Sequence, residues 1–164
     1  MRQGKPVGLQ PPSAAVHCEM IAGKRQMIIG LTHVAIQVSD LERSVRFYCD
    51  VLGLNEHFRL FDDKGHPFLV YLKIADRQFI ELFSGAAGPR EWPTSSSLIH
   101  VCLEVDDIQD SFQRITSKGI KPLHGKPNHA ADNAWQFWVS DPDGNAIEFH
   151  QFTKESLQLR EPAG

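Results

Sequence analysis

The sequence predicts an α+β fold made of two tandem βαβββ modules. The stretch "LTHVAIQVSDL" at 31–41 returns as "LIHVCLEVDDI" at 98–108, so that His33 aligns with His100, 67 positions later. In both copies an alternating strand leads into a helix with one apolar stripe, and further strand-like runs follow. A repeat of this kind determines the architecture, because each copy is expected to form the same supersecondary unit.

The first module opens with a strand whose side chains alternate between two faces. The faces comprise His33, Ala35 and Gln37 on one side and Val34, Ile36 and Val38 on the other. Ser39 or Asp40 caps the helix that follows, and Gly53 ends it. The apolar stripe of this helix comprises Leu41, Val45, Tyr48 and Leu52. Three strands are then expected at "HFRLF", "PFLVYLKI" and "QFIELF".

The second module repeats this order. Its first strand places His100, Cys102 and Glu104 on one face, and its helix is capped by Asp106 or Asp107 and ends at Gly119. The helix stripe comprises Ile108, Phe112 and Ile115. Strands are expected at "KPLHG", "AWQFWVS" and "AIEFHQF", with a turn at "DPDGN" (141–145) before the last.

The chain divides into one domain with two flanking segments. The domain spans 27–152, with module 1 at 27–83, a linker rich in Gly, Pro and Ser at 84–97, and module 2 at 98–152. Residues 1–26 are expected to be a flexible extension, with a targeting segment or a true start at Met27 as alternatives. Residues 153–164 are polar and are expected to form a tail.

Composition excludes several classes of function. The net charge is −3 and there is no basic stripe, so nucleic acid is not the expected partner. Apolar runs stay well short of the roughly 20 residues that span a bilayer, so no membrane partner is expected. The three cysteines are odd in number and lack a CxxC pair, which indicates a reducing compartment and a cytoplasmic location.

Each module also carries a glutamate inside its last strand. Glu81 and Glu148 each lie 48 positions after the histidine of their own module. Glutamate is rarely buried without a partner or a metal. If the modules pack about a pseudo-twofold axis, two imidazoles and two carboxylates form a mixed site for Zn, Ni, Mn, Co or Fe(II), with positions left for substrate. The alternative is an ancestral repeat in which one half keeps its ligands without using them.

The other histidines and the aromatic residues receive simpler interpretations. His150 shares a strand face with Glu148 and is a candidate for the pocket or for support of the metal ligands. The strand expected at "AWQFWVS" contains three aromatic residues that are interpreted as packing residues: Trp135, Phe137 and Trp138. The remaining turn histidines are expected at the surface; they are His57, His66, His124 and His129.

The repeated segments resemble the vicinal oxygen chelate superfamily, which comprises glyoxalases, bleomycin-resistance proteins and dioxygenases. The resemblance rests on the two His-Val segments, on "FIELF", on "FYCDVLG" at 47–53 and on "DPDGNAIE" at 141–148, and it covers nearly all of 28–152. It implies paired βαβββ modules that curl into a cupped mixed sheet around a divalent metal.

The resemblance to glyoxalase I implies metal ligation by His33, Glu81, His100 and Glu148. It also implies a lyase or isomerase that acts on a small substrate with vicinal oxygens through an enediolate, with Glu148 as the base and Glu81 as its symmetric partner. The metal would be Zn, Ni, Co or Mn. Extradiol dioxygenases need two histidines and one glutamate with Fe(II), and bleomycin-binding relatives lack the metal set, so a ring-cleaving enzyme and a binding protein remain alternatives.

Two departures bear on the substrate. Glutathione-dependent glyoxalases have an Arg four residues after the first His and an Asn four residues after the first Glu, where this chain has Gln37 and Gly85. These departures count against a glutathione-dependent glyoxalase, and the expected substrate is another compound with adjacent oxygens, such as an α-keto aldehyde adduct, a 2-oxo acid or a catechol. The resemblance also implies a homodimer, and the modules pair either within one chain or between two.

Overall fold

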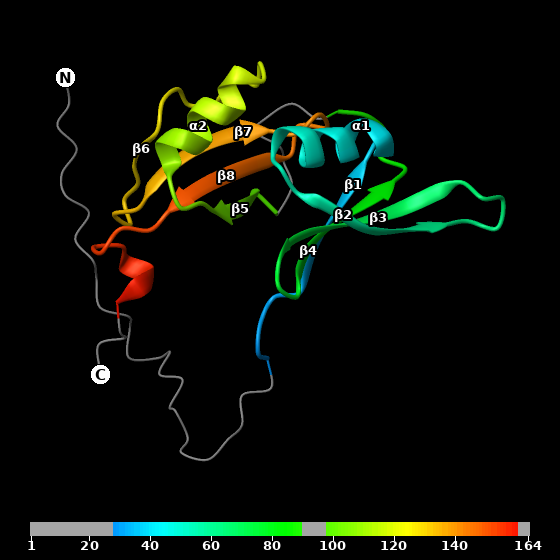
Figure 1. Ribbon diagram of the computed structural model, residues 1–164, viewed down its shortest axis with the longest axis horizontal. Helices are drawn as coiled ribbons and strands as arrows, with labels where there is room; N and C mark the ends of the chain where they lie inside the picture. The colour runs from blue at the N-terminus through cyan, green and yellow to red at the C-terminus, as the bar shows by residue number, and fades with distance from the viewer. Residues whose placement is uncertain (1–27, 90–97, 161–164) are drawn as a thin grey trace, which may run out of the picture. The chain divides into compact units, whose positions relative to one another are not determined.

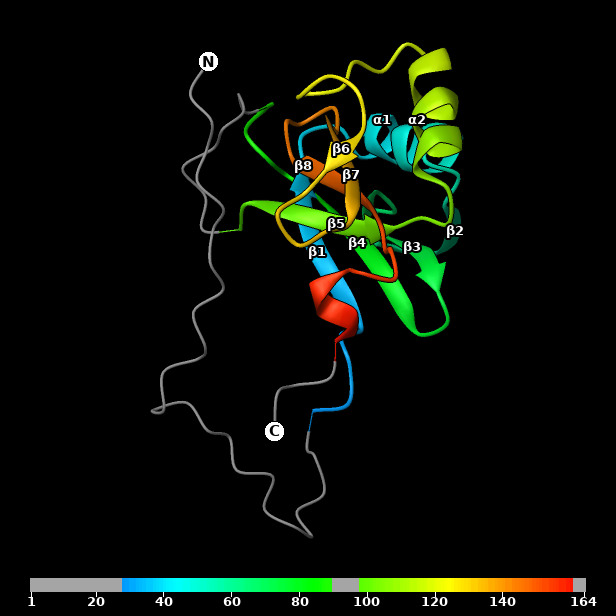
Figure 2. The ribbon, with the colours of Figure 1, turned by 90° about the vertical axis from the view of Figure 1, so that its left-hand side faces the viewer.

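The computed structural model describes residues 28–89 and 98–160. The predicted extension at 1–26, most of the predicted linker and the last four residues of the predicted tail lie outside the described residues. The chain divides after Gly30, and both modules belong to the unit that begins at Leu31. The fold prediction is confirmed: two βαβββ modules give two four-stranded mixed sheets (Figures 1 and 2).

Module 1 forms a sheet with the strand order β1-β4-β3-β2. Strand β1 runs parallel to β4, and the other neighbours are antiparallel. Asp40 caps the helix by accepting a hydrogen bond from the backbone N–H of Arg43. Helix α1 packs on β3 and β4 of its own sheet. The elements are β1 (His33–Val38), α1 (Leu41–Arg46), the π-helical segment η2 (Phe47–Val51), β2 (Asn55–Phe61), β3 (Pro67–Ala75) and β4 (Gln78–Ser84).

Module 2 repeats the order as β5-β8-β7-β6. Asp107 caps its helix by accepting from two backbone N–H groups, and the helix packs on β7 and β8. The elements are β5 (His100–Glu104), α2 (Ile108–Ser117), β6 (Asn128–His129), β7 (Trp135–Ser140), β8 (Ala146–Gln151) and the short 3-10 helix η3 (Leu157–Leu159).

The strand registers of the two modules coincide. Ala35 lies opposite Glu81 in the β1–β4 pair, and Cys102 lies opposite Glu148 in the β5–β8 pair. On the antiparallel side, Tyr71 pairs with Glu81 as Trp138 pairs with Glu148. All of these partners are related by the same 67-residue offset. The repeat therefore places its functional candidates at equivalent points of two sheets.

Two sequence expectations need correction. The strand expected at "KPLHG" does not form; β6 lies at Asn128–His129 instead. Leu123 still donates a backbone hydrogen bond to Trp138, but Pro122 has no N–H and Gly125 has a φ of +83°, so the ladder does not continue. The first helix is not α-helical throughout, because it continues as η2 from Phe47. Both Phe47 and the neighbouring Tyr48 are buried there, whereas the expected stripe contains only Tyr48.

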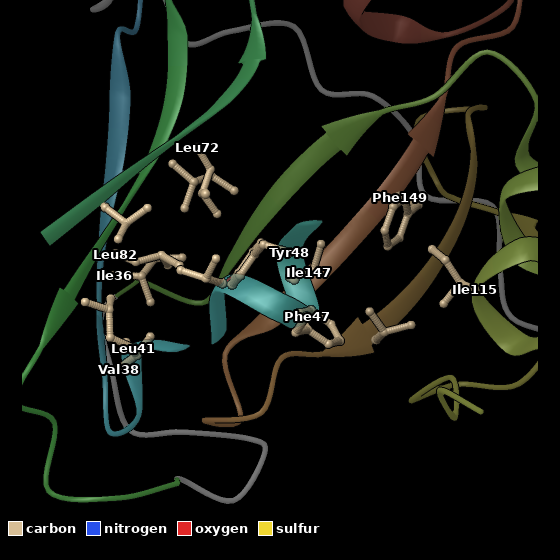
Figure 3. Packing of buried hydrophobic residues seen from close by; sticks show 14 of the residues in the cluster. Ile36, Val38, Leu41, Phe47, Tyr48, Leu72, Leu82, Ile115, Ile147 and Phe149 are labelled. Carbon is tan, nitrogen blue, oxygen red and sulfur yellow. The ribbon is translucent and has the colours of Figure 1, made fainter. Parts of the chain in front are cut away.

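One apolar cluster joins the helix-covered faces of both sheets. Leu72 and Val139 occupy equivalent positions in β3 and β7, and both are fully buried within it. Figure 3 shows Leu72, Leu82 and Ile36 from module 1 and Ile147, Phe149 and Ile115 from module 2. Burying a side chain of the size of Leu72 contributes about 2–3 kcal/mol to stability. The two modules thus share a core.

A polar clamp, formed by Ser39, Arg43, Tyr48, Asp141 and Asp143, also connects the modules. Asp143 accepts hydrogen bonds from the backbone N–H of Ser39 (3.1 Å), from Ser39 Oγ (2.5 Å) and from Arg43 Nη2 (3.2 Å). Asp141 accepts one from Tyr48 Oη at 3.0 Å. Burial alone would raise the pKa of Asp143, but its hydrogen bonds to Ser39 and the charge of Arg43 outweigh it and hold that pKa below the ordinary value. Burial raises the pKa of Tyr48 well above the usual range, and Asp141 adds to the effect.

The first half of the expected tail is attached to module 2. Ser156 is fully buried, and the backbone N–H of Leu157 donates to the carbonyl of Asp132 at 2.9 Å. Thr153 Oγ1 donates to the carbonyl of Asn133 at 2.8 Å. These contacts fix the end of β8 and the loop that precedes β7.

Within residues 28–89 and 98–160, no helix combines the length and the apolar character needed to cross a bilayer.

Candidate metal centre

His33 and Glu81 come together on the open face of the first sheet. The face prediction for β1 is confirmed, because His33, Ala35 and Gln37 are exposed while Ile36 and Val38 are buried. Glu81 is only 7% exposed, and its Oε2 lies 3.5 Å from His33 Nε2. Tyr71 donates a hydrogen bond to Glu81, which raises the pKa of the tyrosine.

His100 and Glu148 form the equivalent pair in module 2. His100 Nε2 lies 3.1 Å from Glu148 Oε2, and Glu148 is 8% exposed. The other carboxylate oxygen, Oε1, lies 3.5 Å from Nδ1 of His150. Glu148 is therefore held between two imidazoles, one from β5 and one from its own strand.

The surroundings of the first pair are aromatic. Tyr71 stacks on Phe58 at 4.5 Å between ring centroids and meets the His33 and Phe79 rings edge-on. His57 stacks on Phe79 at 5.4 Å. This arrangement gives module 1 a planar, apolar wall beside its histidine.

The surroundings of the second pair contain further donor atoms. Cys102, Glu148 and His150 each offer one ligand atom, and these atoms lie within 4.8 Å of one another. Trp138 meets the His100 ring edge-on and donates its indole N–H to Gln136. Cys102 is exposed at the cavity, but partial desolvation of its thiol, together with the charge of Glu148, raises the thiol pKa to about 12.

Within one chain the four predicted ligands are arranged as two pairs. His33 lines a cavity of about 590 Å³, together with Phe79 and with Cys102 and Glu104 of module 2. His100 lines a different cavity of about 170 Å³, together with Ala35 and Gln37. Among the described residues, the group of three or more donors in mutual reach is Cys102, Glu148 and His150, not the predicted four.

Each pair fits half of a divalent-metal site. Two ligand atoms that each lie about 2.1 Å from one metal are about 3.0 Å apart at a right angle and about 3.4 Å apart at a tetrahedral angle. The observed nitrogen–oxygen separations of 3.1 and 3.5 Å match this range. Imidazole nitrogen and carboxylate oxygen are also a donor set that suits Zn, Ni, Co, Mn and Fe.

Sequence reasoning missed Cys102. The alternation of side chains along β5 indicates that Cys102 shares a face with His100. Only the β5–β8 register shows that Cys102 also lies opposite Glu148. The placement of His150 beside Glu148, which the shared strand face indicated, is seen in the structure. The expectation that His57, His66, His124 and His129 are exposed is confirmed, but their placement in turns is wrong for His57, which lies in β2, and for His129, which lies in β6.

The two positions linked to glutathione lie close together. An ideal Cβ on Gly85 would lie 3.4 Å from Gln37 Nε2, which is an ordinary contact. Gly85 has a φ of +104°, a conformation in which a side chain such as that of Asn is strained. The backbone at this point is therefore built for glycine.

Comparison with known proteins identifies the family. The sequence profile of the Glyoxalase/Bleomycin resistance protein/Dioxygenase superfamily matches residues 30–149. A probable lactoylglutathione lyase of Synechocystis sp. is 32% identical over 128 residues, which cover 74% of this chain and 94% of that protein. This chain belongs to the glyoxalase/bleomycin resistance/dioxygenase superfamily.

Two further similarities show the range of the family. An iron-dependent extradiol dioxygenase of Rhodococcus jostii is 33% identical over 146 residues, which cover 80% of this chain and 47% of that protein. The crystal structure of a lactoylglutathione lyase from Agrobacterium tumefaciens superimposes with a TM-score of 0.59 at 23% identity, covering 77% of this chain and 96% of that one. The last similarity concerns the fold alone.

Proposed function

We propose that this protein is a divalent-metal-dependent lyase or isomerase of the glyoxalase type, acting on a small substrate with two neighbouring oxygens. The observation that carries the proposal is the pairing of a histidine with a glutamate, at 3.5 Å in module 1 and 3.1 Å in module 2. Both halves retain a complete pair on the open face of the sheet. The similarity to the Synechocystis lyase favours the same class.

His33, Glu81, His100 and Glu148 would hold the metal. When bound, the cation supplies a Lewis acid that stabilises negative charge developing on the substrate oxygens. Glu148 is our candidate for moving the substrate proton, because its carboxylate is withdrawn from water and lies beside the imidazoles of His100 and His150. Glu81 is its counterpart, held by the Tyr71 hydroxyl.

The substrate is proposed to be something other than a glutathione adduct. Gln37 is a neutral side chain and Gly85 has none, so neither supplies a cationic contact to a tripeptide carboxylate. An aromatic wall of Phe58, Tyr71 and Phe79 lies beside His33 instead. These features favour a smaller or planar substrate.

We also propose that the complete site forms in a homodimer. The histidines of the two pairs line different cavities within one chain, so a site with all four ligands would combine module 1 of one copy with module 2 of another. Mixed dimers of His33→Ala and His100→Ala chains test this arrangement. One of the two sites in such a dimer would contain only intact modules.

Plasma mass spectrometry measures the metal content of the wild type, of each variant and of the mixed dimer. Each variant alone should lose about one ion per chain relative to the wild type, and the mixed dimer should recover about half of that loss. Absence of recovery at full heterodimer formation would contradict pairing between chains. A wild-type protein that takes up no divalent ion would overturn the proposed function.

The similarity to the Rhodococcus dioxygenase supports one second candidate, an Fe(II) ring-cleaving enzyme. That function needs two histidines and one glutamate, so Glu81→Gln should leave it largely intact. Oxygen consumption with catechols, measured on iron-loaded wild type and Glu81→Gln, distinguishes it from the lyase. Turnover that requires both Glu81 and Glu148 and consumes no oxygen excludes the dioxygenase.

A further inference from the structure

A donor cluster, formed by Cys102, Glu148 and His150, lies on the open face of the second sheet. Cys102 on β5 is directly opposite Glu148 on β8, and His150 follows two residues later on the same strand. One ligand atom from each residue lies within 4.8 Å of the other two. A thiol, a carboxylate and an imidazole thus converge from two neighbouring strands.

The cluster is buried on one side and open on the other. His150 is 6% exposed and Glu148 is 8% exposed, whereas Cys102 is exposed and lines the cavity of about 590 Å³. This cavity gives an ion access to the cluster at Cys102, and any metal site requires an entry path.

One ring nitrogen in the cluster lacks a partner. Nε2 of His150 is buried and accepts or donates no hydrogen bond among the described residues. A buried polar atom without a partner loses its hydration without gaining a hydrogen bond, so it needs an explanation. Glu148, Asp132 and Glu104 also place negative charge around Cys102. The negative charge around Cys102 favours a cation there, and His150 faces Glu148 through its other ring nitrogen, Nδ1, at 3.5 Å.

We propose that Cys102, Glu148 and His150 bind a second divalent ion, of the zinc or cobalt type, in module 2. Sulfur, nitrogen and oxygen together are a borderline-soft donor set, which Zn²⁺ accepts in tetrahedral sites with an open fourth position. Glu148 belongs to both sites, with Oε2 toward His100 and Oε1 toward His150. The inference adds to the proposed function and shares Glu148 with it, but it does not require His33 or Glu81.

Module 1 supplies an internal control. The residues equivalent to Cys102 and His150 are Ala35 and Phe83, which offer no ligand atom. The double variant Cys102→Ala/His150→Phe therefore gives module 2 the side chains that module 1 already carries on the same scaffold. The variant preserves Glu148 and His100, so the four-ligand site of the proposed function stays complete.

Cobalt provides the test, because a Co²⁺–thiolate bond gives a near-ultraviolet charge-transfer absorption that oxygen and nitrogen ligands do not. Metal-free full-length protein is titrated with CoCl₂, and bound metal is counted by plasma mass spectrometry. The wild type should bind about two ions per chain and show the charge-transfer band. Cys102→Ala/His150→Phe should bind about one and lack the band, and Cys102→Ser should lack it too. Far-ultraviolet circular dichroism and melting temperature check that each variant is folded.

His33→Ala separates the two sites. It should lose one ion while keeping the charge-transfer band, because its cysteine cluster is untouched. A wild type that binds one ion without the band overturns the second site and leaves the proposed function standing. A band that persists in His33→Ala and His100→Ala, with a single ion in the wild type, supports the cysteine site and overturns the four-ligand site. Binding of no ion overturns both.

Discussion

The two modules have the same strand register, but the side chains around the histidine–glutamate pair differ between them. Where module 1 has Ala35, Tyr71 and Phe83, module 2 has Cys102, Trp138 and His150. The histidine–glutamate pair survives in both because it depends on the strand alternation and the β1–β4 type of ladder. The neighbours are free to diverge, and they have produced an aromatic wall in one module and a donor cluster in the other. Topology thus determines where the histidine–glutamate pairs lie, and local side chains determine what surrounds each pair.

A second difference concerns the turn before the last strand. In module 2 this turn is "DPDGN", and it forms the polar clamp with Ser39, Arg43 and Tyr48. In module 1 the equivalent residues are "IADRQ", in which Asp76 is exposed and makes no contact of this kind among those described. The same turn therefore acts only locally in module 1 and connects the modules in module 2.

The largest expected effect compares the two halves of the core. Leu72→Ala should lower the free energy of unfolding by about 2–5 kcal/mol, because it removes a fully buried side chain and leaves a cavity. The equivalent change Val139→Ala removes fewer atoms and should cost about 2 kcal/mol. Urea denaturation followed by circular dichroism measures both. A larger loss at Val139 than at Leu72 would show that the two halves of the core do not contribute in proportion to the atoms they bury.

The next effect concerns the polar clamp. Asp143→Asn should cost about 2 kcal/mol near neutral pH, because hydrogen bonds to a buried carboxylate are lost or weakened. Asp76→Asn, the matched change in module 1, should stay within about 0.5 kcal/mol of the wild type. Chemical denaturation at several pH values measures both changes.

The clamp also predicts a pH dependence. The pKa of Asp143 is lower in the folded chain than in the unfolded one, so its stabilisation is fully present above the ordinary carboxyl pKa of about 4 and is lost as the pH falls through the folded-state value. The stability gap between wild type and Asp143→Asn should therefore narrow in acid. A gap that is constant down to pH 2 would mean that the charge of Asp143 contributes nothing.

The smallest effect concerns one backbone position in each turn. Gly144 has a φ of +82°, and the equivalent Arg77 has a φ of +58° without being glycine. Gly144→Ala should cost about 1 kcal/mol, because it puts a Cβ into the left-handed region. Arg77→Gly should change stability by less than about 1 kcal/mol, since relief of strain offsets the added freedom of the unfolded chain. Melting temperatures of the two variants, which should move by different amounts, check this comparison.

The sequence predicted the elements that depend on alternation and on the repeat. The faces of β1 and the strand positions of Glu81 and Glu148 follow from local pattern. For each helix cap the pattern left two neighbouring candidates, of which the structure shows Asp40 and Asp107. The prediction of a strand at "KPLHG" was wrong. It considered the apolar residues of this segment but not that Pro122 lacks the backbone N–H needed for a strand ladder. The sequence did not predict the π-helical segment η2. An apolar stripe with α-helical spacing assigns only one of two adjacent residues to the core, whereas Phe47 and Tyr48 are both buried in η2.

Contacts between residues far apart in the chain could not be predicted from local sequence patterns. Nothing local indicates that Asp143 and Asp141 bond to Ser39 and Tyr48, about a hundred residues earlier in the chain, so "DPDGN" appeared to be only a turn. The donor cluster likewise needs the β5–β8 register before Cys102 can be placed against Glu148. The predicted ligands appear as the two pairs that each module holds by itself, and their role in metal binding stays a prediction.

The shared core and the polar clamp have a consequence for how the chain unfolds. A duplicated sequence suggests two domains that melt separately, each with its own transition. Here the apolar cluster runs through both halves, and Asp143 loses its partners as soon as α1 moves away. Opening module 1 exposes apolar surface and leaves the buried carboxylate of Asp143 without partners, and opening module 2 removes the acceptor of Ser39 and Arg43. The duplication thus yields one cooperative unit, in which a local defect in either module is felt as a loss of stability by both.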